Sequence, residues 1–115
     1  MKLWIDDVRP APKGYVWCRS VRDAIIAIEL REARIENILR DYTPSEMRMK
    51  DLTIQIIDID HDAGDYVNDG GDYIKLLNWL EETGRNYPIR IHSMNLVGVE
   101  NMRRIIQRNK WTEVK

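Results

Sequence analysis

The sequence predicts a small three-layer α/β domain, in which a parallel sheet lies between two layers of helices. Three observations support this fold class. From the middle of the chain onward, apolar runs alternate with stretches of helical periodicity. A length of 115 residues is enough for one core and too short for two, so one domain over residues 1–115 is expected. The apolar runs are short and typical of buried strands, and they lie at residues 2–6, 15–19, 53–60 and 88–93.

The first half of the chain is predicted to contain two strands and one long helix. Between the strands, residues 7–15 carry two prolines and a glycine, which argues against a helix there. The long helix follows Ser20, with Asp23 in a capping-box position, and its apolar periodicity continues to Leu39. Residues 42–51 lack this pattern and are interpreted as a surface insertion.

The second half is predicted to alternate between strands and helices. Residues 53–60 are nearly all apolar or β-branched and give the strongest strand signal. One helix is expected over residues 73–80, ending before Gly84, and a last helix over residues 99–106. Residues 111–114 are expected to add a short edge strand. Right-handed crossovers would connect these parallel strands.

Composition and charge exclude several classes of protein. Lysine and arginine number 18 and aspartate and glutamate 19, so the net charge is -1 and nonspecific binding to DNA is not expected. Cys18 is the single cysteine, lies in an apolar run and is expected to be buried. The amino-terminal apolar run is too short for a signal peptide or a membrane span. These features predict a cytoplasmic protein with no membrane partner.

Polar side chains gather where the predicted strands end. In an open parallel sheet, ligands bind outside the carboxyl ends of the strands. Both histidines of the chain fall at such ends, and imidazole titrates near neutral pH, so the two could act as general base and general acid. The candidates are Asp6, Asp7 and Arg9 after the first strand, Asp60, His61 and Asp62 after the third, and His92, Ser93 and Asn95 after the fourth.

The acidic candidates suggest a metal site. Asp6, Asp7 and Asp60 could converge at the edge of the sheet, where their charges would repel and raise some of their pKa values. Mg²⁺ or Mn²⁺ would relieve this repulsion, and Asp62 is a further candidate ligand. Alternatively, some of these carboxylates cap turns or pair with Arg9. The guanidinium of Arg9 could also hold a phosphate through two hydrogen bonds.

Three segments together resemble a known family. They are residues 5–10 (IDDVRP), residues 60–64 (DHDAG) and residues 92–95 (HSMN), in this order and with the expected elements between them. Their combination is similar to the motifs of the cyclic-phosphate-processing receiver domains, an offshoot of the response-regulator receiver fold. The resemblance implies a flavodoxin-like sheet with strand order 2-1-3-4-5. It also implies a role in handling cyclic phosphates on nucleotides or RNA ends.

The resemblance also suggests roles for single residues. In ordinary receivers, an acidic pair after the first strand binds Mg²⁺, and Asp6 and Asp7 match this pair. Asp60 matches the aspartate that accepts a phosphoryl group, and Ser93 matches the hydroxyl residue after the fourth strand. The two histidines are not part of the ordinary receiver pattern, and no lysine near the carboxyl terminus follows a strand as it does in receivers. A phosphorelay role is therefore less favoured.

The leading hypothesis is a phosphoesterase-like domain that binds or opens a cyclic phosphate on a nucleotide or an RNA end. The predicted catalytic residues are His61, His92 and Asp60; the predicted substrate-binding residues are Arg9, Ser93 and Asn95; the predicted metal ligands are Asp6, Asp7 and Asp60, with Asp62 in addition. Three alternatives remain open. They are a sensor that binds a cyclic nucleotide without turnover, a phospho-accepting receiver that uses Asp60, and an interaction domain with an inert site.

Overall fold

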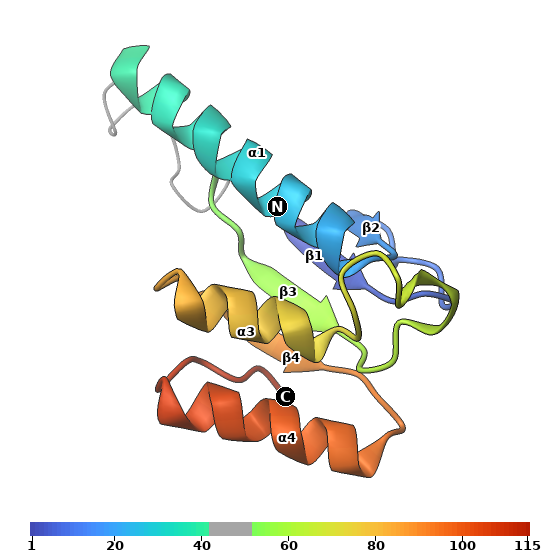
Figure 1. Ribbon diagram of the computed structural model, residues 1–115. Coiled ribbons are helices and arrows are strands. Elements are labelled where there is room, and N and C mark those ends of the chain that lie inside the picture. The colour runs from blue at the N-terminus through green and yellow to red at the C-terminus, as the bar shows by residue number, and fades with distance from the viewer. Residues whose placement is uncertain (42–51) are drawn as a thin grey trace.

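A computed structural model describes residues 1–41 and 52–115 of the chain. Its centre is a parallel sheet in the order β2-β1-β3-β4, which confirms the predicted α/β, receiver-like fold and the first four positions of the predicted strand order (Figure 1). The predicted insertion at residues 42–51 lies outside the described residues. The strands are β1 (Lys2–Ile5), β2 (Tyr15–Cys18), β3 (Ile56–Ile59) and β4 (Ile89–Ile91).

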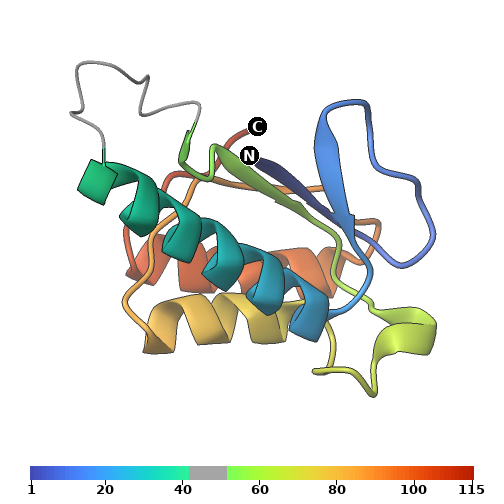
Figure 2. The same ribbon diagram turned by 90° about the horizontal axis from the view of Figure 1, so that it is seen from above.

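The long helices all lie on one face of the sheet (Figure 2). From β2 onward every crossover moves along the sheet in the same direction, and right-handed crossovers then place their helices on the same side. The connection from β1 to β2 moves the opposite way and contains turns instead of a helix. The expected second helical layer is therefore not seen among the described residues. The helices are α1 (Val21–Asp41), α3 (Ile74–Glu82) and α4 (Leu96–Arg108).

Because side chains alternate along each strand, one face of the sheet is buried under the helices and the other is left uncovered by the described residues. In parallel strands, residues in register point to the same side of the sheet. The core side chains under the helices include Leu3, Ile5, Ile57, Ile59 and Ile89, all with no exposed surface. Their neighbours along the strands point to the other face, which carries no helix among the described residues: Lys2 and Trp4 of β1, Tyr15 and Trp17 of β2, Ile56 and Asp58 of β3, and Arg90 of β4.

All the predicted strands are shorter in the structure, and the one predicted over residues 88–93 reduces to Ile89–Ile91. The strand predicted over residues 53–60 forms β3 only over Ile56–Ile59, the residues in register with β1; before it, the Gln55 amide donates to the Met1 carbonyl and the Met1 amino group donates to the Thr53 carbonyl. The predicted edge strand reduces to a single parallel bridge between Ile89 and Glu113, so a fifth strand is not formed among the described residues.

A local signal places the start of α1 as the sequence predicts, whereas the last helix, predicted over residues 99–106, spans Leu96–Arg108. Ser20 Oγ accepts a hydrogen bond from the Asp23 amide at 3.0 Å, which caps α1. Cys18 is buried, and burial raises the pKa of its thiol to about 11, as expected for an inert core side chain. None of the helices in the described part of the chain is long and apolar enough to cross a membrane.

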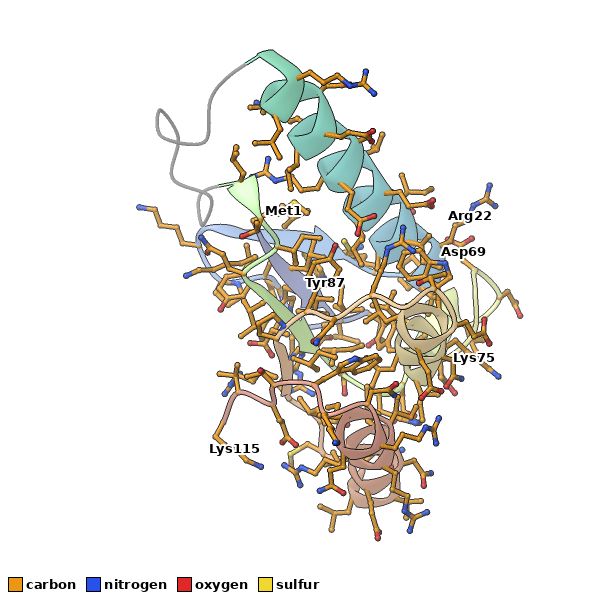
Figure 3. The ribbon with its side chains drawn as sticks, turned by 90° about the vertical axis from the view of Figure 1, so that its left-hand side faces the viewer. Met1, Arg22, Asp69, Lys75, Tyr87 and Lys115 are labelled. Carbon is orange, nitrogen blue, oxygen red and sulfur yellow. The ribbon has the colours of Figure 1, made fainter. Side chains whose placement is uncertain are left out.

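The loop between β3 and α3 packs against the start of α1. The Arg22 amide donates to the Asp69 carbonyl at 3.1 Å, and the two side chains approach to 4.0 Å (Figure 3). Gly70 has a φ of +113° and lies so close to α1 that a Cβ there would come within 2.8 Å of Val21 Cβ. The loop contains the short 3₁₀ helix η2 (Gly64–Tyr66) and is thus fixed beside the carboxyl ends of the strands.

Tyr73 provides a first test of this packing. Its side chain is fully buried, and its hydroxyl donates to the Arg19 carbonyl at 2.7 Å, which ties α3 to the end of β2. We expect Tyr73→Phe to lower the free energy of unfolding by about 1–2 kcal/mol, because the carbonyl loses its partner. Urea unfolding followed by tryptophan fluorescence measures this change. Tyr66→Phe, which removes only a surface hydrogen bond from Arg19, should cost less; equal costs would contradict this account.

Candidate functional site

The candidate residues converge at the carboxyl ends of β1, β3 and β4. Backbone hydrogen bonds extend the ladder one residue beyond the strands, from the Asp60 amide to Ile5 and from the His92 amide to Ile59, both at 2.9 Å. This register places Asp6, Asp60 and His92 side by side at the edge of the sheet. Residues separated by more than 80 positions thereby meet, as Asp6 and His92 do at 2.9 Å.

Asp6 is the buried anchor of the site. Its Oδ1 accepts hydrogen bonds from the backbone amides of Val8 and Arg9, at 2.9 and 2.8 Å, and its Oδ2 faces His92 Nε2. Burial raises the pKa of this carboxyl, but the two amides and His92 outweigh it and lower the pKa overall. Asp6 is therefore held as a carboxylate.

Arg9 lies over the acidic residues from the connection between β1 and β2. Its Nε is 3.3 Å from Asp6 Oδ2, and its Nη2 is 3.5 Å from Asp60 Oδ2. Its carbonyl accepts from Trp4 Nε1 at 2.8 Å, which fixes the backbone. The Arg9 side chain is half exposed. The guanidinium can thus compensate the carboxylates and still meet an anion from solvent.

Asp6, Asp7 and Asp60 form a cluster that suits a hard cation. Each contributes one carboxylate oxygen to a group in which all oxygens lie within 4.8 Å of one another. Burial raises the pKa of Asp7, and the charges of Asp6, Asp60 and Asp65 raise it further. The cluster fits Mg²⁺ or Mn²⁺ in donor type. Asp62, the additional candidate ligand, lies outside this cluster.

The raised pKa of Asp7 predicts a stability effect. Its carboxylate is disfavoured in the fold, so the cost is absent below its ordinary pKa of 3.8 and develops as the pH rises through the raised value. Without divalent ions, Asp7→Asn should melt at a higher temperature than wild type at pH 7, and the difference should shrink toward pH 4. Mn²⁺ should raise the melting temperature of wild type more than that of the variant. Asp69→Asn is the control, and an equal Mn²⁺ response in Asp7→Asn would refute the metal site.

Gly64 packs closely against the side chain of Asp7. This glycine has a φ of +54°, and a Cβ there would collide with the Asp7 carboxylate.

Asp60 is almost fully buried: its Oδ1 accepts from the His61 amide at 2.8 Å, and its Oδ2 faces Arg9. The residue that matches a receiver's phosphoryl acceptor therefore has both oxygens engaged.

His92 is held between two carboxylates. Nδ1 lies 2.6 Å from Asp58 Oδ1, Nε2 lies 2.9 Å from Asp6 Oδ2, and the ring stacks on Trp4 with centroids 3.8 Å apart. Asp58 also meets Arg90 at 3.0 Å. Hydrogen bonds to both carboxylates require both ring nitrogens to donate, so this geometry suits the imidazolium form. His92 is 8% exposed, which places it inside the site.

His61 is held differently: its side chain is 14% exposed, and only one of its ring nitrogens faces a carboxylate. Nδ1 lies 2.8 Å from Asp62 Oδ1 and 3.3 Å from Asn95 Nδ2. Nε2 has no hydrogen-bond partner among the described residues and reaches solvent. The ring rests against Gly98 of α4, where an added Cβ would come within 2.8 Å of Nδ1 and closer still to two ring carbons. An Asp-oriented imidazole with a free second nitrogen is a typical arrangement for proton transfer.

Asn95 and Ser93 shape the end of β4. Asn95 caps α4, since its Oδ1 accepts from the Gly98 amide at 2.9 Å, while its Nδ2 donates to Asp62 at 3.3 Å. Ser93 Oγ accepts from the Asn95 amide at 3.1 Å. Asn95 therefore links the Asp62 carboxylate to the start of α4.

Several contributors were not among the predicted site residues. Asp58 is one of them, and its sequence signal is an acid inside an otherwise apolar buried strand. Trp4, Arg90 and Gly98 gave no signal of function in the sequence. Trp4 and Gly98 contribute through contacts with His92 and His61, and Arg90 contributes through Asp58; all three contacts are long-range.

The site is an open surface with an apolar rim. The described residues form no enclosed pocket. Three exposed apolar side chains lie on the segments that follow β1 and β4: Val8 after β1, Met94 after β4 and Leu96 at the start of α4 are 73%, 87% and 81% exposed. A ligand at this site would lie against the carboxyl ends of the strands and remain accessible from solvent.

The sheet topology, the acidic cluster and the aspartate at the end of β3 define a receiver-like α/β domain. Residues 1–108 match the family model of the cyclic-phosphate processing receiver domain. The chain therefore belongs to this family, as its motifs predict. The comparison with curated proteins and the comparison with solved structures give no match.

Proposed function

We propose that this domain opens cyclic phosphates on nucleotides or RNA ends by hydrolysis. In this reaction water attacks phosphorus, one bond from phosphorus to a ring oxygen breaks, and the leaving oxygen takes up a proton while water loses one. The observation that carries the proposal is His61, whose Nδ1 is oriented by Asp62 and whose Nε2 is free, one residue from the acidic cluster. The family's link to cyclic-phosphate processing supports the same reaction.

In this proposal His61 exchanges the proton with water or with the leaving oxygen. The Asp62 carboxylate accepts from Nδ1, fixes the tautomer and leaves Nε2 for the reacting group. Asn95 and Gly98 hold the pair and the ring in place. General acid–base catalysis of this kind contributes about 10²–10⁴-fold to a rate.

The phosphate would be held by Arg9 and by groups at the end of β4. Arg9 can turn its exposed guanidinium toward two phosphate oxygens, and Ser93 offers a hydroxyl. Asp6, Asp7 and Asp60 would hold Mg²⁺ or Mn²⁺. A bound divalent ion would supply charge stabilisation for the phosphate oxygens.

His92 has a supporting part in this proposal. Both of its nitrogens are engaged by buried carboxylates, so it acts through Asp6 by fixing the position of that carboxylate. The sequence placed His92 and Asp60 beside His61 as catalytic residues. Their burial favours positioning and electrostatic roles within the same reaction.

Hydrolysis of cyclic nucleotides tests the proposal. Purified protein is incubated with 2′,3′-cyclic and 3′,5′-cyclic nucleotides in EDTA, Mg²⁺ or Mn²⁺, and ring-opened products are separated by chromatography. We expect turnover by wild type and a loss of at least about 10²-fold in His61→Ala. Arg104→Ala, an exposed substitution on α4, is the control and should retain the wild-type rate. Absence of turnover under every condition would refute the hydrolase, and full activity of His61→Ala would refute its role.

A second candidate function is cyclic-nucleotide binding without turnover. The observation that favours it is the internal pairing of the site, because Arg9 and His92 already contact Asp6 and Arg9 also faces Asp60. Titration calorimetry with the same nucleotides distinguishes the two. Saturable binding, weakened in Arg9→Ala and accompanied by no product, would favour the sensor.

A further inference from the structure

The open face of the sheet presents a band of aromatic side chains that leads to the site. This inference rests on the proposed function and concerns the part of the substrate beyond the phosphate. Tyr15, Trp17 and Trp4 point to the face that has no helix among the described residues, and each is partly exposed. Trp4 meets Tyr15 edge to face, with centroids 6.1 Å apart, and stacks on His92 on the other side. The band thus runs from the β2 edge to the acidic cluster.

Cations accompany these rings. The Arg19 guanidinium lies 4.0 Å from the centre of the Trp17 ring, and Lys2 Nζ lies 5.6 Å from the centre of the Tyr15 ring. Arg19 and Lys2 are both exposed, and Arg90 on the same face is 43% exposed. This arrangement supplies planar groups and positive charge together.

The acidic side chains near this face are buried and do not neutralise the positive charge that it presents to solvent. Asp58 is 2% exposed and already contacts His92 and Arg90, and Asp6 is fully buried against its own partners. The charges that an incoming ligand meets on this face are therefore mainly positive, although the chain carries a net charge of -1. Such a surface is complementary to a phosphate backbone.

We propose that this face binds the unpaired nucleotides that precede a cyclic phosphate at an RNA end. Single-stranded nucleic acids bind where bases can stack on aromatic rings or guanidinium planes and a cationic surface follows the backbone. Here the bases would lie against Trp17, Arg19 and Tyr15, and the terminal phosphate would reach Arg9. The face would favour an RNA end over a free cyclic nucleotide.

Kinetics with two substrates test the surface. One is a 2′,3′-cyclic mononucleotide, and the other is a six-nucleotide unpaired RNA that ends in the same cyclic phosphate. We expect KM to be about tenfold lower for the RNA, in keeping with stacking of one or more bases. The double variant Lys2→Ala/Arg19→Ala should lose this advantage and keep the mononucleotide rate. Lys75→Ala/Arg104→Ala removes two exposed cations from other surfaces and should change neither substrate.

Binding of a fluorescent RNA of the same sequence with a 3′-hydroxyl separates this proposal from the hydrolase itself. Anisotropy should show saturable binding that weakens with salt and in Lys2→Ala/Arg19→Ala. Such binding without any turnover would refute the hydrolase and keep the RNA surface. Turnover of the mononucleotide with no RNA preference and no anisotropy change would refute the RNA surface and keep the hydrolase. Equal RNA binding by wild type and the double variant would also overturn it.

Discussion

Gly98→Ala is expected to lower turnover of a cyclic phosphate by about 10²-fold in a protein that still folds. Gly98 lies in the first turn of α4 directly behind His61, and an added methyl group would occupy the position of the ring. The ring must then move away from Asp62, whose carboxylate orients its Nδ1. A displacement of about 1 Å at a catalytic group can cost on the order of 10²-fold in rate. Steady-state rates of the variant measure the effect.

A stability cycle separates displacement of His61 from damage to α4. Alanine is favoured over glycine inside a helix by about 1 kcal/mol, so any net loss in Gly98→Ala reflects the collision with the ring. In a His61→Ala background the collision disappears, and Gly98→Ala should then stabilise the protein in urea. Leu96→Ala, at an exposed position in the same turn, should leave turnover unchanged. A Gly98→Ala variant with wild-type turnover would contradict the positioning role.

The fold was largely predictable because its signals are local. The apolar runs at β1, β2 and β4 and the Ser20 cap each depend on a few neighbouring residues, and all appear where expected. The extent of β3 was overestimated, since only Ile56–Ile59 are in register with β1. No local pattern reports such a pairing.

Helices cover only one face of the sheet in the described part of the chain because the connection between β1 and β2 contains no helix. The prolines between β1 and β2 correctly argue against a helix there, and this is the one connection whose direction would place a helix on the opposite face. Expecting two helical layers overlooked this consequence. The same absence leaves Trp4 and Trp17 on an open face that extends to the site.

The sequence predicts which residues gather at the candidate site, but it does not predict which of them contact one another. The rule that parallel strands present their ligands at their carboxyl ends brought Asp6, Asp60 and His92 together before any contact was known. The partner of each ring nitrogen could not be read in advance, because Asp58 and Asp6 are 34 and 86 positions from His92. These contacts distinguish His92, with both ring nitrogens engaged, from His61, whose Nε2 has no partner among the described residues.

His92→Ala is expected to cause the largest loss of stability, about 3–5 kcal/mol in the free energy of unfolding. Removing the ring deprives two buried carboxylates of their shared partner and takes away the stacking surface of Trp4. Loss of one member of a buried ion pair commonly costs this much, because a charge is left without compensation. Urea unfolding at pH 7 measures the loss. Arg90→Ala removes the more exposed partner of Asp58 and should cost less than about 1 kcal/mol.

The acid side of the stability profile tests the same network. The lowered pKa of Asp6 means that its contribution to stability is complete above the ordinary value of 3.8 and is lost as the pH falls through the lowered value. His92 is one cause of that lowering, so His92→Ala should lose less stability than wild type between pH 5 and the acid transition. Parallel wild-type and variant profiles, or a loss at pH 7 no larger than that of Arg90→Ala, would show that His92 does not compensate the buried carboxylates. Asp6 would then be held by the Val8 and Arg9 amides alone.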